Sequence, residues 1–224
     1  MAFFPELEHQ SLPQLETRFV SHYPPNNDPA ESDLWFQEIA VRIARTGSEG
    51  LSFLLNRIAD ADVTRQRAIA LSLCFLDKDV RQPHIQRLRT FLLAALSHEN
   101  PLLIADAIDS LWHLGICDAN EAIWSMRQHW SPYVVGAVLR YFSRCHPSVA
   151  KPLLLECLRS AEPVVRQNAI DVIDDLAWIE ALPHVRLLLA DEDGDVRQAA
   201  LTAITDLEHR RTMINTTDRA TGVP

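Results

Sequence analysis

The sequence predicts an all-α protein, an α-solenoid of stacked antiparallel helix pairs. The first observation is that the segment Pro163–Ile170 returns 31 residues later as Gly194–Leu201. The second is that apolar residues keep a helical spacing through these segments, and the third is a composition that favours helices. Self-similarity at a fixed period indicates a repeat array, in which each repeat buries its apolar face only against its neighbours.

The composition agrees with a folded helical protein. Of the 224 residues, 47% are hydrophobic and 23% are charged, and only six are glycine. This chain is too apolar for disorder, and it contains few helix breakers. The cysteines show no CxxC spacing and are predicted to be reduced and structural. Together with the lack of a signal peptide or a membrane-spanning apolar run, this predicts a cytoplasmic protein. The cysteines are Cys74, Cys117, Cys145 and Cys157.

The net charge of −9 is unevenly distributed along the chain. Residues 1–60 carry nine acids and four bases, residues 61–160 carry nine acids and eleven bases, and residues 161–208 carry eleven acids and three bases. Nucleic-acid binding needs a basic surface, so acidic ends disfavour it. The charge predicts a protein partner that is basic or polar at the contact surface. No membrane association is predicted, because no apolar run is long enough to span a bilayer.

The first part of the chain is less regular than the rest. Residues 1–32 are predicted to form an N-terminal arm or cap, with a short helix beginning after Ser11 and a loop at Pro24–Pro29. Helical pairs are expected from residue 33, and Asp62 is predicted to cap the first helix of a repeat. That repeat matches the next at a distance of 39 residues, from Ala68 to Ala107, so its connection is about eight residues longer.

From residue 100 the period of 31 is constant. Pro101, Pro132, Pro163 and Gly194 are predicted to begin helices, since proline is tolerated at a first helical position. The residues before them, Asn100, Ser131, Glu162 and Asp193, are the expected N-caps. Four apolar columns follow at i, i+4, i+5 and i+8, on one helical face. The array is expected to span residues 33–208, before a flexible tail at 209–224 that follows any helical extension through Arg211.

These segments resemble the HEAT-repeat family, in the short form shared with phycobilin-lyase-type proteins. The copy at Asp193–Leu201 resembles the HEAT signature most clearly, and Glu162–Arg166 begins a second copy. The resemblance covers roughly residues 62–208. It implies that the helix with the Val-Arg pair lines the concave side of a curved array. It also implies that Arg166 and Arg197 tie repeats together through nearby acids such as Asp193 and Asp195.

If the Val-Arg helices line a groove, their polar residues are candidates for a partner site. The alternative is that these residues form only a solvated face with weak surface ion pairs. The candidates are Asp106, Asp109, His113, Arg140, Tyr141, Arg144, Asp171, Asp174, Asp175 and Asp206.

No catalytic residue, metal site or cofactor is predicted, because no nucleophile motif and no HExxH motif occurs. The predicted function is a non-enzymatic protein-binding scaffold or regulatory module, of which an inhibitor or immunity-type protein is one form. The resemblance leaves open a phycobilin lyase or chaperone-like accessory subunit. A more remote alternative is a HEAT-like DNA glycosylase, which Trp112, Asp109 and Arg140 resemble only superficially.

Overall fold

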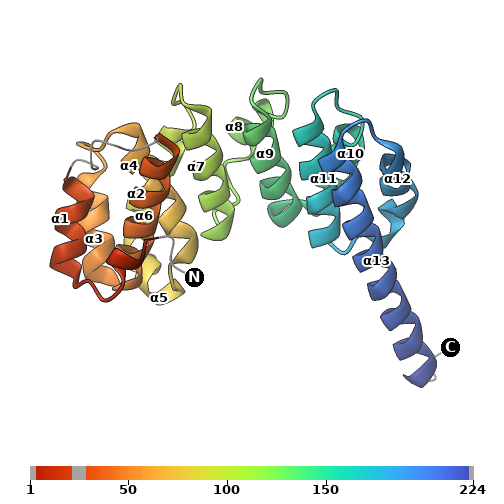
Figure 1. Ribbon diagram of the computed structural model, residues 1–224, viewed down its shortest axis with the longest axis horizontal. Coiled ribbons are helices and arrows are strands. Elements are labelled where there is room, and N and C mark those ends of the chain that lie inside the picture. The colour runs from red at the N-terminus through yellow and green to blue at the C-terminus, as the bar shows by residue number, and fades with distance from the viewer. Residues whose placement is uncertain (1–3, 22–28, 222–224) are drawn as a thin grey trace. The chain divides into compact units, whose positions relative to one another are not determined.

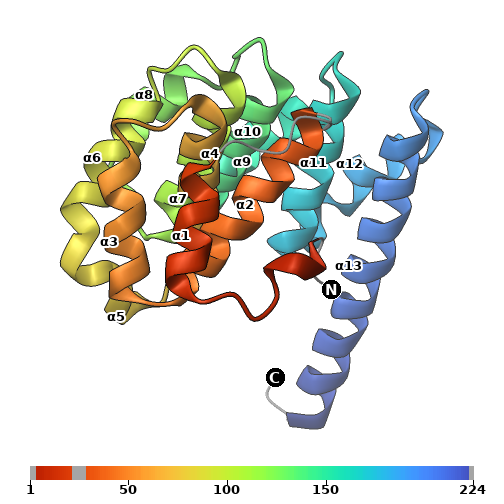
Figure 2. The same ribbon diagram turned by 60° about the vertical axis from the view of Figure 1, so that its left-hand side comes forward.

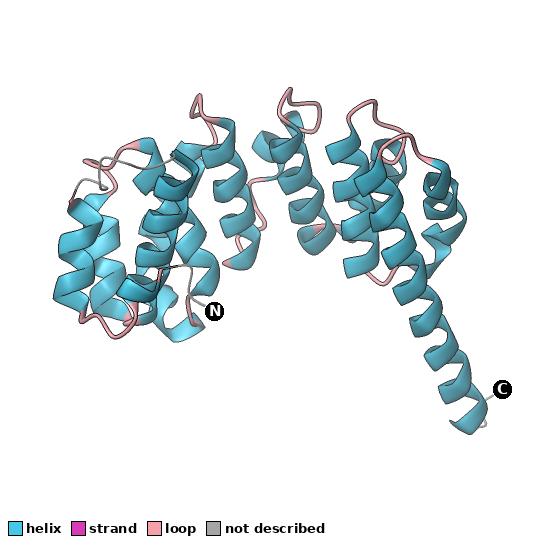
Figure 3. Cartoon of the chain, in the orientation of Figure 1, coloured by secondary structure: helices cyan, strands magenta, loops and turns pink. Residues whose placement is uncertain are grey.

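The computed structural model describes residues 4–21 and 29–221. Within these ranges every regular element is helical (Figure 3), which confirms the predicted all-α class. The α-helices are α1 Leu12–Val20, α2 Pro29–Arg45, α3 Ser48–Arg57, α4 Val63–Ser72, α5 Lys78–Arg81, α6 Ile85–Ala95, α7 Pro101–His113, α8 Asn120–Ser125, α9 Pro132–Cys145, α10 Pro147–Cys157, α11 Pro163–Asp175, α12 Leu182–Leu187 and α13 Gly194–Thr221. Short 3-10 helices lie at Pro5–Leu7, Leu73–Phe75, Gln82–His84, Ile179–Ala181 and Leu188–Ala190.

The chain divides into two compact units, Met1–Ser125 and Met126–Pro224, where the sequence predicted one array over residues 33–208. In the first unit α2, α4 and α7 pack in sequence, with α1 and α3 against α2 and α6 against α7 (Figure 1). The connection predicted to be longer is occupied by α5 and the 3-10 helix that follows it. The loop predicted at Pro24–Pro29 lies outside the described residues up to residue 28, and Pro29 already begins α2.

In the second unit α9, α11 and α13 pack in sequence, with α10 against α9 and α11, and with α12 against α13. Figure 2 shows α13 beside α11 and α12 and running past both of them. It continues to Thr221, so the boundary predicted at residue 208 does not coincide with a helix end. Among the residues of α13 whose burial is described, the last buried apolar one is Leu207, which is fully buried. The flexibility of the tail stays a prediction.

The predicted helix starts are confirmed, and two of the four predicted caps use their side chains. Pro101, Pro132, Pro163 and Gly194 are first helical residues. Asn100 Oδ1 accepts hydrogen bonds from the backbone N–H groups of Leu102 (2.9 Å) and Leu103 (3.1 Å). Asp193 Oδ1 accepts from those of Asp195 (2.9 Å) and Val196 (3.1 Å). The side chains of Ser131 and Glu162 make no capping bond.

The cysteine prediction is wrong for two residues. Cys117 and Cys145 are disulfide-bonded, whereas Cys74 and Cys157 are free thiols. Burial raises the pKa of Cys74 and of Cys157 to about 11, so both thiols are protonated near neutral pH. They contribute as small apolar side chains, as expected.

Replacing Gly50 with alanine is expected to destabilise the first unit by about 1–3 kcal/mol, a typical cost of overpacking. A Cβ at Gly50 would lie 2.0 Å from the carbonyl oxygen of Ile43 in α2, and backbone cannot move aside locally. Gly194→Ala is the matched control, because its Cβ would meet only Arg197 Nη2, at 3.6 Å. Thermal unfolding of both variants checks the prediction. Equal stability of the two variants would contradict it.

Candidate functional site

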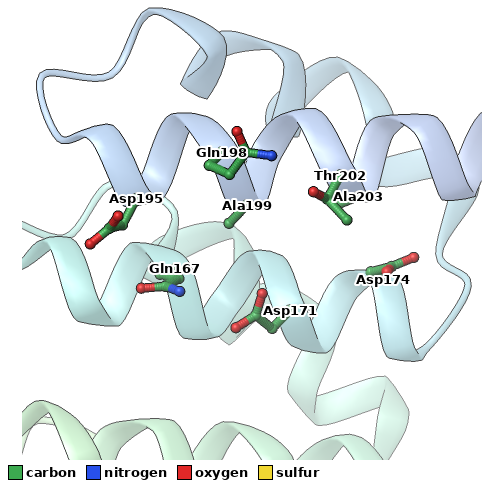
Figure 4. A pocket seen from close by; sticks show the side chains of 8 residues that line it. All are labelled: Gln167, Asp171, Asp174, Asp195, Gln198, Ala199, Thr202 and Ala203. Carbon is green, nitrogen blue, oxygen red and sulfur yellow. The ribbon is translucent and has the colours of Figure 1, made fainter.

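One candidate site is a cleft in the second unit between α11 and α13, with a volume of about 270 Å³. Figure 4 shows its polar side chains lying along the two facing helices. We call it the α11–α13 cleft. Its lining residues are Gln167, Asp171 and Asp174 from α11, and Asp195, Gln198, Ala199, Thr202 and Ala203 from α13.

The helical period explains why these residues share one cleft. Ala169 and Ile173 of α11 and Ala200 of α13 are buried and hold the two helices together. Polar residues recur three or four positions apart beside this apolar seam, as in Asp171 and Asp174, so they lie on one side of each helix. On α13 the facing positions include Ala199, whose short side chain leaves room between the helices.

The cleft is acidic, and its carboxylates affect one another. Burial raises the pKa of Asp171, the carboxylates of Asp175 and Asp174 raise it further, and Arg140 lowers it. Burial likewise raises the pKa of Asp174, which Arg210 lowers and Asp206 and Asp175 raise. Crowded carboxylates of this kind create a negative potential that attracts a cation.

Two arginines lie at the margins of the α11–α13 cleft. Arg210 Nη1 lies 3.3 Å from Asp174 Oδ1 and also donates to the carbonyl oxygen of Asp174. Arg140 Nη1 donates to Asn168 Oδ1 at 3.3 Å. Asp171 and Asp175 are exposed, and within the described part of the chain neither forms an ion pair. These two acids are therefore accessible charges beside the cleft.

The predicted residues on α9 differ in exposure. Arg144 is exposed and Arg140 is half-buried. Tyr141 is fully buried, with its ring edge-on to Phe142 at 5.4 Å between ring centres. Its prediction as a groove contact is wrong, because its side of α9 faces the interior.

The three predicted residues on α7 belong to the first unit. Asp106 is paired with Arg67 of α4 at 3.0 Å, and Arg67 also pairs with Asp33 of α2. Burial raises the pKa of Asp106 to about 6, against the lowering effect of Arg67. Asp106 thus links α7 to α4 through Arg67. The other predicted residues on α7, Asp109 and His113, form a small group with Trp112.

In that group Asp109 Oδ1 accepts from Trp112 Nε1 at 3.2 Å. The exposed ring of His113 stacks on Trp112 with 3.5 Å between ring centres. His113 Nδ1 lies 2.9 Å from the carbonyl oxygen of Asp109. The group contains no nucleophile, so it carries no triad of the kind used in acyl transfer.

Arg166 ties neighbouring repeats together as predicted, but to a different acid. Its Nε and Nη2 donate to the two carboxylate oxygens of Asp191 at 2.9 and 2.6 Å. Its Nη1 donates to the carbonyl oxygens of Ser160 (2.8 Å) and Ala161 (3.1 Å). Asp193, the predicted partner, instead caps α13, so that part of the prediction is wrong.

Arg197 and Asp195 also differ from the prediction. Arg197 Nη1 donates to the carbonyl oxygens of Asp191 (2.7 Å) and Glu192 (2.9 Å), in the loop before its own helix. Asp195 is exposed in the first turn of α13 and lines the α11–α13 cleft. Its carboxylate is favoured there by the helix dipole and forms no repeat tie.

Sequence reasoning missed Gln167 and Gln198, which both line the α11–α13 cleft. The signal for both was present, because each follows the arginine in its copy of the repeated segment. It also missed Asp191, Arg67 and Arg210, whose roles depend on three-dimensional neighbours.

Within the described ranges no group of three or more His, Cys, Asp or Glu side chains could hold a metal ion. In the same part of the chain no helix is both long enough and apolar enough to cross a membrane.

Comparison with known proteins places this geometry among the helical repeat proteins. Residues 119–205 match the family model for HEAT repeats. No curated protein matches the sequence. A designed armadillo repeat protein in complex with the peptide (KR)4 is 16% identical with a TM-score of 0.50, over 88% of this chain and 100% of that chain. An engineered protein is 16% identical with a TM-score of 0.53, over 89% of this chain and 99% of that one.

The complex of CpcE and CpcF of phycocyanin lyase from Nostoc sp. PCC7120 is 17% identical with a TM-score of 0.51, covering 88% of this chain and 82% of that chain. Identities this low show the fold alone, and these proteins differ in function. The predicted solenoid class and the resemblance to HEAT-repeat proteins are confirmed.

Proposed function

We propose that this HEAT-repeat solenoid is a non-enzymatic protein-binding module, and that its α11–α13 cleft binds a segment of a partner protein carrying lysine or arginine. The observation that carries the proposal is the convergence of Asp171, Asp174 and Asp195 on one open cleft between two packed helices. A rigid scaffold that holds like charges together favours a ligand of opposite charge.

The raised pKa values of Asp171 and Asp174 support a cationic ligand. Each carboxylate is disfavoured in its charged form by burial and by its acidic neighbours. A lysine or arginine side chain is already protonated when it enters the cleft. Its positive charge would offset the repulsion between the carboxylates without any proton transfer. A polar uncharged ligand would offset little of it.

The size of the cleft supports side chains as the bound groups. Its volume of about 270 Å³ lies at or below the lower end of the roughly 300–1,000 Å³ typical of small-molecule pockets. One or two long basic side chains fit such a space, whereas a tetrapyrrole needs more. At this cleft, size therefore favours basic side chains over a tetrapyrrole.

The similarity in fold to a designed armadillo repeat protein solved with the peptide (KR)4 supports the same proposal as an analogy. It suggests the probe for a first test. In an extended peptide successive side chains alternate in direction, so every second residue could reach an acidic helical face.

Binding of a fluorescently labelled (KR)4 peptide, measured by anisotropy at low salt, tests the proposal. Asp171→Lys and Asp195→Lys, which both change exposed acids of the cleft lining, are each expected to weaken binding by about tenfold or more, as for loss of a close charge pair. Binding by the wild-type protein is expected to fall as salt is added, because screening acts on an open cleft.

Glu180→Lys is the matched control, because it makes the same charge change at an exposed acid of the same unit that does not line the cleft. It is expected to retain binding within about twofold, as a distant surface charge would. Equal loss in the control and the cleft variants would reduce the effect to net charge and overturn the assignment of the cleft. Circular dichroism confirms that each variant is folded.

A further inference from the structure

The repeat register shows which surface of α12 and α13 lacks a neighbour. Leu201 occupies the column of Ile108, Leu139 and Ile170. These three side chains are 0% exposed, whereas Leu201 is 52% exposed. In the described part of the chain no helix follows α13, and no described side chain covers Leu201 in the way that Ile170 is covered.

The outer side of the same repeat shows the same contrast. Leu189 is 44% exposed, and its counterpart one repeat earlier, Leu158, is 5% exposed. Burial of an equivalent leucine in the earlier repeat therefore depends on the helices that follow it. Two leucines of the last described repeat are left in solvent, where the favourable burial of their apolar surface is not realised.

Arg197 shows the third contrast. Like Arg166, it folds back onto the two carbonyl groups five and six residues earlier. Arg166 uses its remaining nitrogens, Nε and Nη2, to bind Asp191 of the following repeat. Among the described residues no hydrogen bond uses Nε or Nη2 of Arg197, so half of its guanidinium group is available to a carboxylate.

These residues form one surface, which we call the end face. On α13, Arg197, Leu201, Thr205 and Glu208 are spaced four, four and three residues apart and so lie on one side of the helix. All four are exposed. Leu189 lies in the 3-10 helix that follows α12, and that element packs against α13. The end face is separate from the α11–α13 cleft, whose α13 residues lie on another side of the helix.

We infer that the end face binds a second copy of this chain, through antiparallel pairing of the two α13 helices. The stripe is complementary to itself: it has a cation at Arg197, an apolar centre at Leu201 and Thr205, and an anion at Glu208. When two such stripes run in opposite directions, the Arg197 end of each helix meets the Glu208 end of the other. A two-fold axis near the centre of the stripe then forms both ion pairs at once.

The length and existing contacts of α13 suit this pairing. The helix has 28 residues, or about 42 Å at 1.5 Å per residue, and it runs past α11 and α12 (Figure 2). Glu208 already pairs with Arg186, but the two side chains are 48% and 52% exposed. Exposed pairs contribute little, so Glu208 can exchange Arg186 for Arg197 of the second copy at small cost.

Sedimentation equilibrium of the full chain across the micromolar range tests the inference. The wild-type protein is expected to dimerise, and Leu201→Glu is expected to weaken the dimer by about tenfold or more, since it places two carboxylates at the centre of the interface. Arg197→Glu is expected to weaken it similarly. The double variant Arg197→Glu/Glu208→Arg restores both opposed charge pairs and is expected to recover most of the wild-type affinity.

Leu187→Glu is the control. Leu187 is 73% exposed, and its counterpart one repeat earlier is Glu156, which is also exposed, so this position lies off the end face. It is expected to leave the dimer unchanged. A wild-type protein that is monomeric throughout the range, a Leu201→Glu variant that dimerises normally, or an equal loss in Leu187→Glu would each overturn the inference. None of these outcomes bears on peptide binding in the cleft.

Discussion

Replacing Arg166 with alanine is expected to lower the free energy of unfolding by about 3–5 kcal/mol, the usual cost of breaking a buried ion pair by removing one partner. Arg166 is 6% exposed, and it binds both oxygens of Asp191 as well as two carbonyl groups. Its loss leaves a carboxylate and two carbonyls without their donor in a poorly hydrated place. For a chain of this size the melting temperature should fall by roughly 6–20 °C.

Arg197→Ala is the matched control for this experiment. Arg197 occupies the equivalent position one repeat later and binds the equivalent two carbonyls, but it is exposed and has no bidentate acid. Its removal is expected to cost about 1 kcal/mol or less, like other exposed contacts. Equal destabilisation by the two variants would show that the carbonyl contacts matter and that the pair with Asp191 does not.

The pair with Asp191 also predicts a dependence on pH. The hydrogen bonds from Arg166 hold the pKa of Asp191 below its ordinary value of 3.8. A lowered folded-state pKa contributes stability that is present above pH 3.8 and is lost as the pH falls through the lower folded-state value. The free energies of unfolding of the wild-type protein and of Arg166→Ala, measured by denaturation, should therefore converge as the solution is acidified through this range. A constant difference between them would contradict this origin.

The partner of Arg166 could not be predicted from the sequence, although its role as a tie could. Four acids, Asp191, Glu192, Asp193 and Asp195, lie within five residues in the loop before α13 and its first turn. Which of them meets the guanidinium group depends on the path of that loop. Asp193 is committed to the N-terminus of α13, where its side chain caps two N–H groups, and this places Asp191 two residues earlier against Arg166.

The 31-residue period of the sequence predicted much of the fold, because the residues of one apolar column have equivalent neighbours in every repeat. It predicted the helix starts and the acids of α11 beside the cleft. It could not predict that Tyr141 turns inward, since a tyrosine with polar neighbours suits either side of a helix. It also could not predict the division at Ser125–Met126, which depends on contacts between residues distant in the sequence.

The columns themselves predict the second large effect. Ile170→Ala is expected to lower the free energy of unfolding by about 2–5 kcal/mol, because it removes three buried carbons and leaves a cavity that packed neighbours fill only in part. Ile170 is 0% exposed. It belongs to α11, which lies between the repeats on either side of it.

Leu201→Ala, one repeat later in the same column, is expected to cost less than about 1 kcal/mol, since little buried area is lost. The comparison should be made by chemical denaturation at the lowest usable protein concentration, where a second copy contributes least. If stacking of the next repeat buries this column, the cost at Leu201 should rise with protein concentration as the end face becomes covered, and the cost at Ile170 should not. A cost at Leu201 that matches Ile170 in the dilute protein would mean that burial within the repeat itself, and not the following repeat, stabilises this column.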